Sequence, residues 1–87
     1  MVREVLTITN AAGLHARPAA AFSQKAKQFD STVKICFHDA EYNVKSVVSL
    51  LTAGIVNGST IELVVDGNDE REALAALLEM AQNGFGE

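Results

Sequence analysis

The sequence lacks several features that mark other classes of protein. Its 87 residues include one cysteine, one proline and no tryptophan. A single cysteine cannot form an intramolecular disulfide, which favours a reducing compartment. No apolar run approaches the ~18 residues that span a bilayer, and residues 1–4 lack the charged and apolar regions of a signal peptide. We therefore expect a cytoplasmic protein without membrane association.

Positive charge and metal-ligand clusters are also scarce. Lys and Arg number 7 against 11 for Asp and Glu, for a formal net charge of −4. A nucleic-acid-binding domain normally shows a basic face, so we expect no nucleic-acid partner. Cys36 and His38 lack further ligands at metal-site spacing, so no metal site is expected. We interpret His38 as an exposed histidine and Cys36 as a structural or surface thiol.

The residues that are present indicate one globular domain. Hydrophobic residues make up 48% of the chain and charged residues 21%. Alternating apolar residues predict strands over residues 4–9, 32–38, 42–44 and 59–66, and helical spacing predicts helices that end at Asp30, Thr52 and Gly84. The predicted fold class is α+β, in the order βαββαβα. Its four-stranded antiparallel sheet has helices on one face.

Polar residues and glycine mark the expected helix ends. Ser46 is placed near the N-cap of the second helix and Gly54 at its stop. Asp69, with Glu72 three residues later, is a weak form of the capping box for the last helix. In the second helix, Leu50 and Leu51 are expected in the core, whereas Val47 and Val48 are the candidates for exposure.

The segment from Gly13 to Ala20 joins the first strand to the first helix. Backbone N–H groups of the first helical turn have no partner within the helix, and together with the helix dipole they favour an anion. Arg17 adds a planar, permanently charged donor fork. Imidazole is a nucleophile that is available in neutral form near pH 7. The segment therefore predicts a phosphoryl site on His15, and the helix begins either at Pro18 or with His15 as its N-cap.

Two stretches, residues 13–19 and 43–51, carry a family resemblance over essentially the whole chain. The chain resembles the HPr family of histidine-containing phosphocarrier proteins of bacterial phosphotransferase systems. The resemblance implies an open-faced β-sandwich with three helices on one face. It also implies that His15 accepts a phosphoryl group from enzyme I, by the family pattern on Nδ1, and passes it to an EIIA component. On this basis we expect a carrier without a cofactor rather than an enzyme. The second stretch departs from the family pattern at Ser49, where family members often have glycine.

The resemblance further implies regulation and a set of partners. Ser46 matches a serine that an ATP-dependent kinase modifies, so HPr kinase/phosphorylase and transcriptional regulators are further partners. A serine at an N-cap also has a sufficient structural reason to be there. We expect a monomer, with Lys25 and Lys27 contributing to a basic rim. The candidate partner-binding residues are Ala16, Ala20, Lys45, Val47, Val48 and Leu51.

Two alternative functions stay open. A regulatory binding module of the same fold would act through phosphorylated Ser46 or in nitrogen-branch signalling. Residues 82–87 look somewhat like the nitrogen-branch relatives, whereas Lys45 and Ser46 look like the sugar branch. A hydrolase is the weaker alternative, because the fold is small for a substrate pocket.

Overall fold

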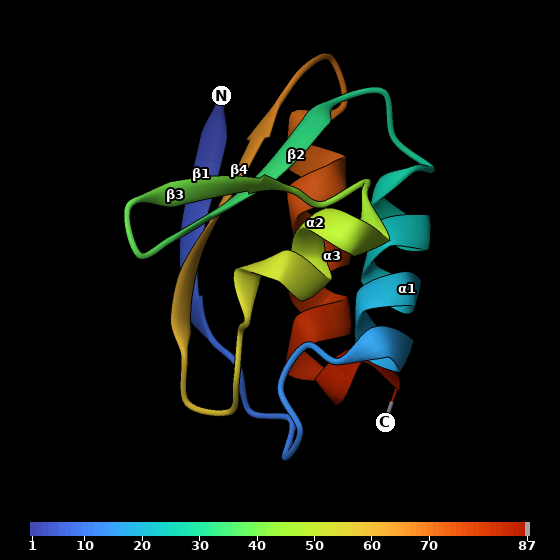
Figure 1. The fold of residues 1–87 in the computed structure, drawn as a ribbon. Coiled ribbons are helices and arrows are strands. Elements are labelled where there is room, and N and C mark those ends of the chain that lie inside the picture. The colour runs from blue at the N-terminus through green and yellow to red at the C-terminus, as the bar shows by residue number, and fades with distance from the viewer. Residues whose placement is uncertain (87) are drawn as a thin grey trace.

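The structure is a computed structural model that describes residues 1–86, and it has two layers (Figure 1). The four strands form one antiparallel sheet in the order β1-β4-β2-β3, and the helices cover one of its faces. The predicted open-faced sandwich is confirmed. None of the helices in the described residues is long and apolar enough to cross a membrane. The elements are β1 (Val2–Thr7), α1 (Ala16–Ala26), β2 (Thr32–Phe37), β3 (Ala40–Asn43), α2 (Val47–Ala53), β4 (Thr60–Asp66), α3 (Glu70–Gln82) and a 3₁₀ turn (Gly84–Gly86).

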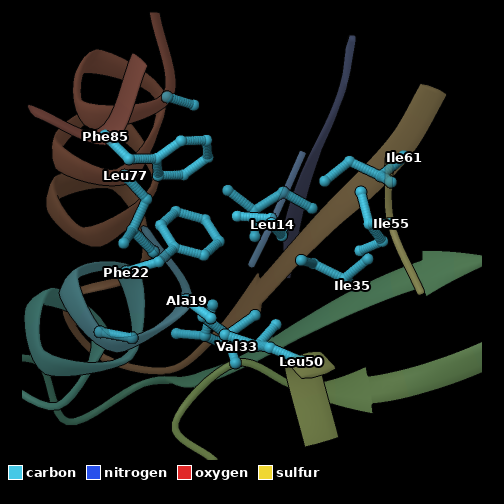
Figure 2. Packing of buried hydrophobic residues seen from close by; sticks show 14 of the residues in the cluster. Leu14, Ala19, Phe22, Val33, Ile35, Leu50, Ile55, Ile61, Leu77 and Phe85 are labelled. Atoms are coloured by element: carbon cyan, nitrogen blue, oxygen red, sulfur yellow. The ribbon is translucent and has the colours of Figure 1, made fainter. Parts of the chain in front are cut away.

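The core lies between the inner face of the sheet and the helices. Ile35 of β2 is paired with Leu63 of β4, and both side chains are fully buried. Phe22 of α1 and Leu77 of α3 belong to the same cluster from the helical side. Figure 2 shows Leu14 between the two aromatic rings and the isoleucines of the sheet side. The residue before His15 is thus part of the core.

Two of the strands begin two residues earlier than predicted. β1 spans Val2–Thr7 and β3 spans Ala40–Asn43. The early start of β3 follows from the turn before it, in which His38 and Asp39 both have positive φ values, 51° and 63°. A two-residue turn of this kind matches the twist of a hairpin. Pairing therefore starts directly after the turn, with Phe37 opposite Ala40, two residues before the predicted start of the strand.

Asp69 is the N-cap residue of α3, but the predicted capping box is wrong. Its side chain makes no cap hydrogen bond to its own helix. Instead the carboxylate accepts bonds from the N–H of Asp30 (2.8 Å), the N–H of Ser31 (3.0 Å) and the hydroxyl of Ser31 (2.5 Å). The start of α3 is therefore tied to the loop that precedes β2. The Ser31 hydroxyl and the Asp30 N–H hold the pKa of Asp69 below its ordinary value.

This contact predicts a stability that depends on pH. A carboxyl whose pKa is lowered by folding stabilises the protein above its unfolded-state pKa of about 4. That contribution is lost as the pH falls through the folded-state value. We expect Asp69→Asn to lower the urea midpoint at pH 7, and the difference from wild type to shrink toward pH 3. Glu70 has a lowered pKa as well, because the Gly67 N–H donates to it, so the variant keeps part of the pH dependence. Urea unfolding at pH 7, 5 and 3 measures this, and a difference independent of pH would contradict it.

Candidate functional site

The segment that leads to His15 is held by the segment that follows α2. The N–H of Leu14 donates to the carbonyl of Ile55 at 3.0 Å. Gly13, at φ +66°, closes a turn in which its N–H donates to the carbonyl of Asn10 at 3.0 Å. With the Leu14 side chain buried in the core, the residue before His15 is fixed through both its backbone and its side chain.

Helix α1 begins at Ala16 with His15 as the N-cap, which decides between the two starts that the sequence left open. His15 has extended backbone angles, φ −79° and ψ −171°. The N–H of Ala19 donates to the His15 carbonyl at 3.0 Å, as the first bond of the helix. Pro18 lies inside the first turn and contributes no N–H. The amides of Ala16 and Arg17 therefore have no acceptor within the helix.

The side chains at this helix start suit an anion. His15 is half-buried and Arg17 is exposed. The first turn of α1 contains no acidic residue. From residue 5 to 29 and from residue 42 to 61 the sequence has no carboxylate. The charged residues of α1 are therefore the cations Arg17 and Lys25, with Lys27 at its C-cap, and α2 carries no charge. A group that gains negative charge at His15 would meet a helix dipole, two amides and a guanidinium.

Helix α2 has the caps that the sequence predicted. Ser46 is the N-cap, and its Oγ accepts a bond from the Ser49 N–H at 3.2 Å. Gly54 ends the helix in the left-handed conformation, at φ +66°. The helix packs against α1, the helix that starts at His15, as Figure 1 shows. Ser46 therefore has the structural role that its position predicted.

One side of α2 is apolar and open to solvent. Val48 is 74% exposed and Leu51 is 45% exposed, whereas Leu50 is fully buried and Val47 is half-buried against the core. The expectation that Leu51 lies in the core is wrong, because one residue is a rotation of about 100° on a helix and only Leu50 points inward. Exposed Val56, in the segment after α2, was missed.

The other candidate residues lie at several places around α1. Ala16 is exposed in the first turn and Ala20 is half-buried in the next. Lys45 donates from Nζ to the carbonyl of Phe29 at 2.8 Å, so its ammonium group is held at the end of α1 opposite His15. The interpretation of His38 as an exposed residue is confirmed, and its ring stacks on Phe37 with centroids 3.9 Å apart.

No metal centre is found in the part of the chain that the structure describes. Groups of three or more potential ligands are absent among residues 1–86. Cys36 is a free, half-buried thiol of β2. Desolvation raises the pKa of this thiol, so burial favours its protonated form.

Comparison with known proteins places this geometry in a family. The family PTS-HPr, described as the PTS HPr component phosphorylation site, matches residues 2–83. The chain belongs to the HPr family. It is 40% identical over 87 residues to the phosphocarrier protein HPr of Neisseria meningitidis, covering 100% of this chain and 98% of that protein. It is 42% identical over 78 residues to the HPr-like protein Crh of Halalkalibacterium halodurans, covering 90% of this chain and 93% of that protein.

A solved structure agrees with the fold. HPr-C-His from Thermoanaerobacter tengcongensis superposes with a TM-score of 0.96 at 37% identity, covering 100% of this chain and 98% of the other. The predicted family is thus confirmed, and with it a general role as a phosphocarrier protein of the phosphotransferase system.

Proposed function

We propose that this chain carries a phosphoryl group on His15, accepting it from phosphorylated enzyme I and donating it to an EIIA protein. The observation that carries the proposal is the position of His15 at the N-cap of α1, beside two amides with no acceptor in the helix. Membership of the HPr family supports it. The chain is a stoichiometric shuttle that holds one phosphoryl group and has no turnover of its own.

Each transfer is a substitution at phosphorus. The lone pair of an imidazole nitrogen of His15 forms the new bond, while the bond from phosphorus to the donor atom of enzyme I breaks and its electrons return to that atom. A neutral imidazole attacks without losing a proton from the attacking nitrogen. The family pattern favours Nδ1 as that atom. Donation to EIIA is the same step with His15 as the leaving group.

Positioning and charge stabilisation are the protein's main contributions to such a step. The phosphoryl group spreads negative charge over three oxygens in the transition state. The amides of Ala16 and Arg17 and the dipole of α1 stabilise this charge from the backbone. The guanidinium of Arg17 adds two parallel N–H donors when it approaches the phosphoryl oxygens.

Arg17→Ala is expected to slow transfer from enzyme I by about 100-fold, because it removes a charged donor from the transition state. Arg17 is exposed, so the free energy of unfolding should change by less than about 0.5 kcal/mol. Arg17→Lys should retain part of the rate, since lysine keeps the charge and loses the donor fork. Arg71→Ala, which removes an exposed cation from α3, is the matched control. Single-turnover rates and urea unfolding measure both quantities, and equal losses for Arg17→Ala and Arg71→Ala would contradict the role.

Partner proteins are proposed to dock on α2 and the adjoining part of α1. Val48 and Leu51 supply exposed apolar surface, and half-buried Val47 lies beside them. Neither α1 nor α2 contains a carboxylate, and α1 carries the cations Arg17 and Lys25. A partner surface that is apolar at its centre and acidic at its rim would be complementary. Ala16 and Ala20 would permit close approach next to His15.

Regulation through Ser46 is the second candidate function. Similarity to Crh of Bacillus subtilis, which is named catabolite repression HPr, and the position of Ser46 at the start of α2 favour it. A phosphate there would meet the positive end of the helix and would add negative charge beside the apolar docking surface. Label from ATP and a cognate kinase that disappears in Ser46→Ala would identify this function, independently of His15.

The direct test of the carrier function uses enzyme I and labelled phosphoenolpyruvate. The wild-type chain should take up one label per molecule, stable in base and labile in acid as expected for a phosphohistidine. Addition of an EIIA protein should discharge the label. A chain that stays unlabelled under conditions that charge enzyme I would contradict the proposal.

A further inference from the structure

Two asparagine side chains connect the segment before His15 to distant parts of the chain. Nδ2 of Asn57 donates to the carbonyls of Thr9 and Asn10, at 3.0 Å each. Nδ2 of Asn10 donates to the carbonyl of Gly84 at 2.8 Å. The segment after α2, the turn before His15 and the turn after α3 are therefore joined in one series of bonds between side chain and backbone.

The Asn10 amide is held in this arrangement at some cost in stability. Asn10 is only 8% exposed, and its Oδ1 has no hydrogen-bond partner within the described residues. An unsatisfied buried acceptor is unfavourable, so the bond that Nδ2 of Asn10 donates has to compensate for it. That bond leads to Gly84, and the next residue, Phe85, contacts Phe22 of α1 edge-on with ring centroids 5.0 Å apart. Figure 2 shows these two rings next to each other beside Leu14.

The series of bonds thus reaches α1 by two routes. One runs through Asn10 and the C-terminal turn to the body of the helix. The other runs through the Gly13 turn, which closes on the Asn10 carbonyl, to Leu14 and His15. Within residues 1–86, Asn57 is the contributor whose side chain binds two consecutive carbonyls, those of Thr9 and Asn10, from outside this turn. Without these bonds, the turn keeps its closing bond, and the backbone bonds from Leu14 to Ile55 and from Gly58 to Ile8 remain on either side of it. What is lost is the side-chain link from Asn57 to the carbonyls of Thr9 and Asn10.

We propose that Asn57 is a positioning residue for phosphoryl transfer, which it promotes by fixing the turn that presents His15. This role rests on the proposed carrier function of His15. Transfer requires the attacking nitrogen to lie in line with the breaking bond, and small displacements of a reacting group lower the rate by an order of magnitude or more. Asn57 touches no reacting atom and acts through the Thr9 and Asn10 carbonyls.

The test compares Asn57→Ala with Asn57→Gln and with a control, Asn68→Ala. Asn68 is an exposed asparagine in the connection between β4 and α3. Asn57→Ala should lower the transfer rate at saturating enzyme I by about tenfold, while the KM of enzyme I for the chain changes little. Asn57→Gln keeps the amide donors and should recover most of the rate, and Asn68→Ala should behave as wild type.

A second measurement is independent of phosphorylation. Amide hydrogen exchange should accelerate in Asn57→Ala at Gly13 and Leu14, whose N–H groups bond to Asn10 and Ile55, and stay unchanged in β2 and β4. Uniform acceleration, or none at these two amides, would overturn the positioning role. A higher KM with an unchanged rate at saturating enzyme I would also overturn the positioning role, because it would mean that Asn57 contributes to the docking of enzyme I. An unlabelled wild-type chain overturns the carrier function itself and this role with it, whereas a labelled wild type with an unaffected Asn57→Ala overturns only the latter.

Discussion

His15→Ala is expected to take up no phosphoryl label from enzyme I and to unfold at nearly the same urea concentration as wild type. The imidazole supplies the attacking nitrogen, and alanine has no nucleophilic atom to replace it. His15 is half-buried at the N-cap of α1, and replacement of an N-cap residue by alanine costs about 1 kcal/mol. The change in the unfolding midpoint should therefore be small compared with the complete loss of label.

The second histidine provides a matched control. His38 is exposed in the turn between β2 and β3 and has a φ of +51°. Asparagine tolerates this left-handed conformation better than alanine, so His38→Asn is the suitable variant. It should be labelled like wild type. Labelling that survives in His15→Ala, or that disappears in His38→Asn, would show that the phosphoryl group is carried elsewhere.

The fold was largely predictable because its elements follow local rules. The central strands alternate apolar and polar residues and pair as one sheet, with Ile35 opposite Leu63. Ser46 and Gly54 mark the ends of α2 by cap chemistry that depends only on neighbouring residues. The kind and order of the elements therefore agree with the prediction.

The errors arise where distant residues compete with a local rule. Asp69 has the sequence context of a capping box, but Ser31, 38 positions away in the chain, offers it an N–H and a hydroxyl. The Asp69 carboxylate bonds to these donors in the folded state instead of capping its own helix. Donors in another loop cannot be recognised from the sequence around Asp69. Leu51 shows a related difficulty, because a helix of 7 residues is too short for its apolar spacing to define the buried side.

In the candidate site, too, the sequence reveals what neighbouring residues determine and does not reveal contacts between distant residues. The motif around His15 and Arg17 is contiguous, so the sequence places both residues at one helix start. The contacts that hold the segment before His15 come from residues 55–57, more than 40 positions along the chain. Asn57 and Gly58 have the composition of a turn, which predicts a loop but gives no sign of which backbone the asparagine binds. The close approach of Gly13 to the backbone of residues 55 and 56 has no local sequence signal either.

Gly13→Ala is expected to be the most destabilising of the substitutions considered, with a loss of about 3 to 4 kcal/mol. Gly13 has a φ of +66°, which costs an L-residue about 1 kcal/mol or more. In addition, a Cβ at this position would lie 2.5 Å from the carbonyl oxygen of Ile55 and 2.6 Å from Cα of Val56. Both are backbone atoms, so no side-chain rotation relieves the overlap, and such overpacking adds about 1 to 3 kcal/mol.

Gly54→Ala separates the two contributions. Gly54 has the same φ of +66°, and a Cβ there would meet nothing within 4 Å. The Gly54→Ala variant should lose only the free energy that the positive φ costs, about 1 kcal/mol, which corresponds to roughly 4–8 °C in melting temperature for a domain of this size. Gly13→Ala should melt at least about 12 °C below wild type, and its carrier activity should fall as well, since relief of the overlap must move the Leu14–Ile55 contact next to His15. Equal melting temperatures in the two variants would mean that residues 55 and 56 move away from the added Cβ without any loss of stability. The segment after α2 would then not be what holds His15 in place.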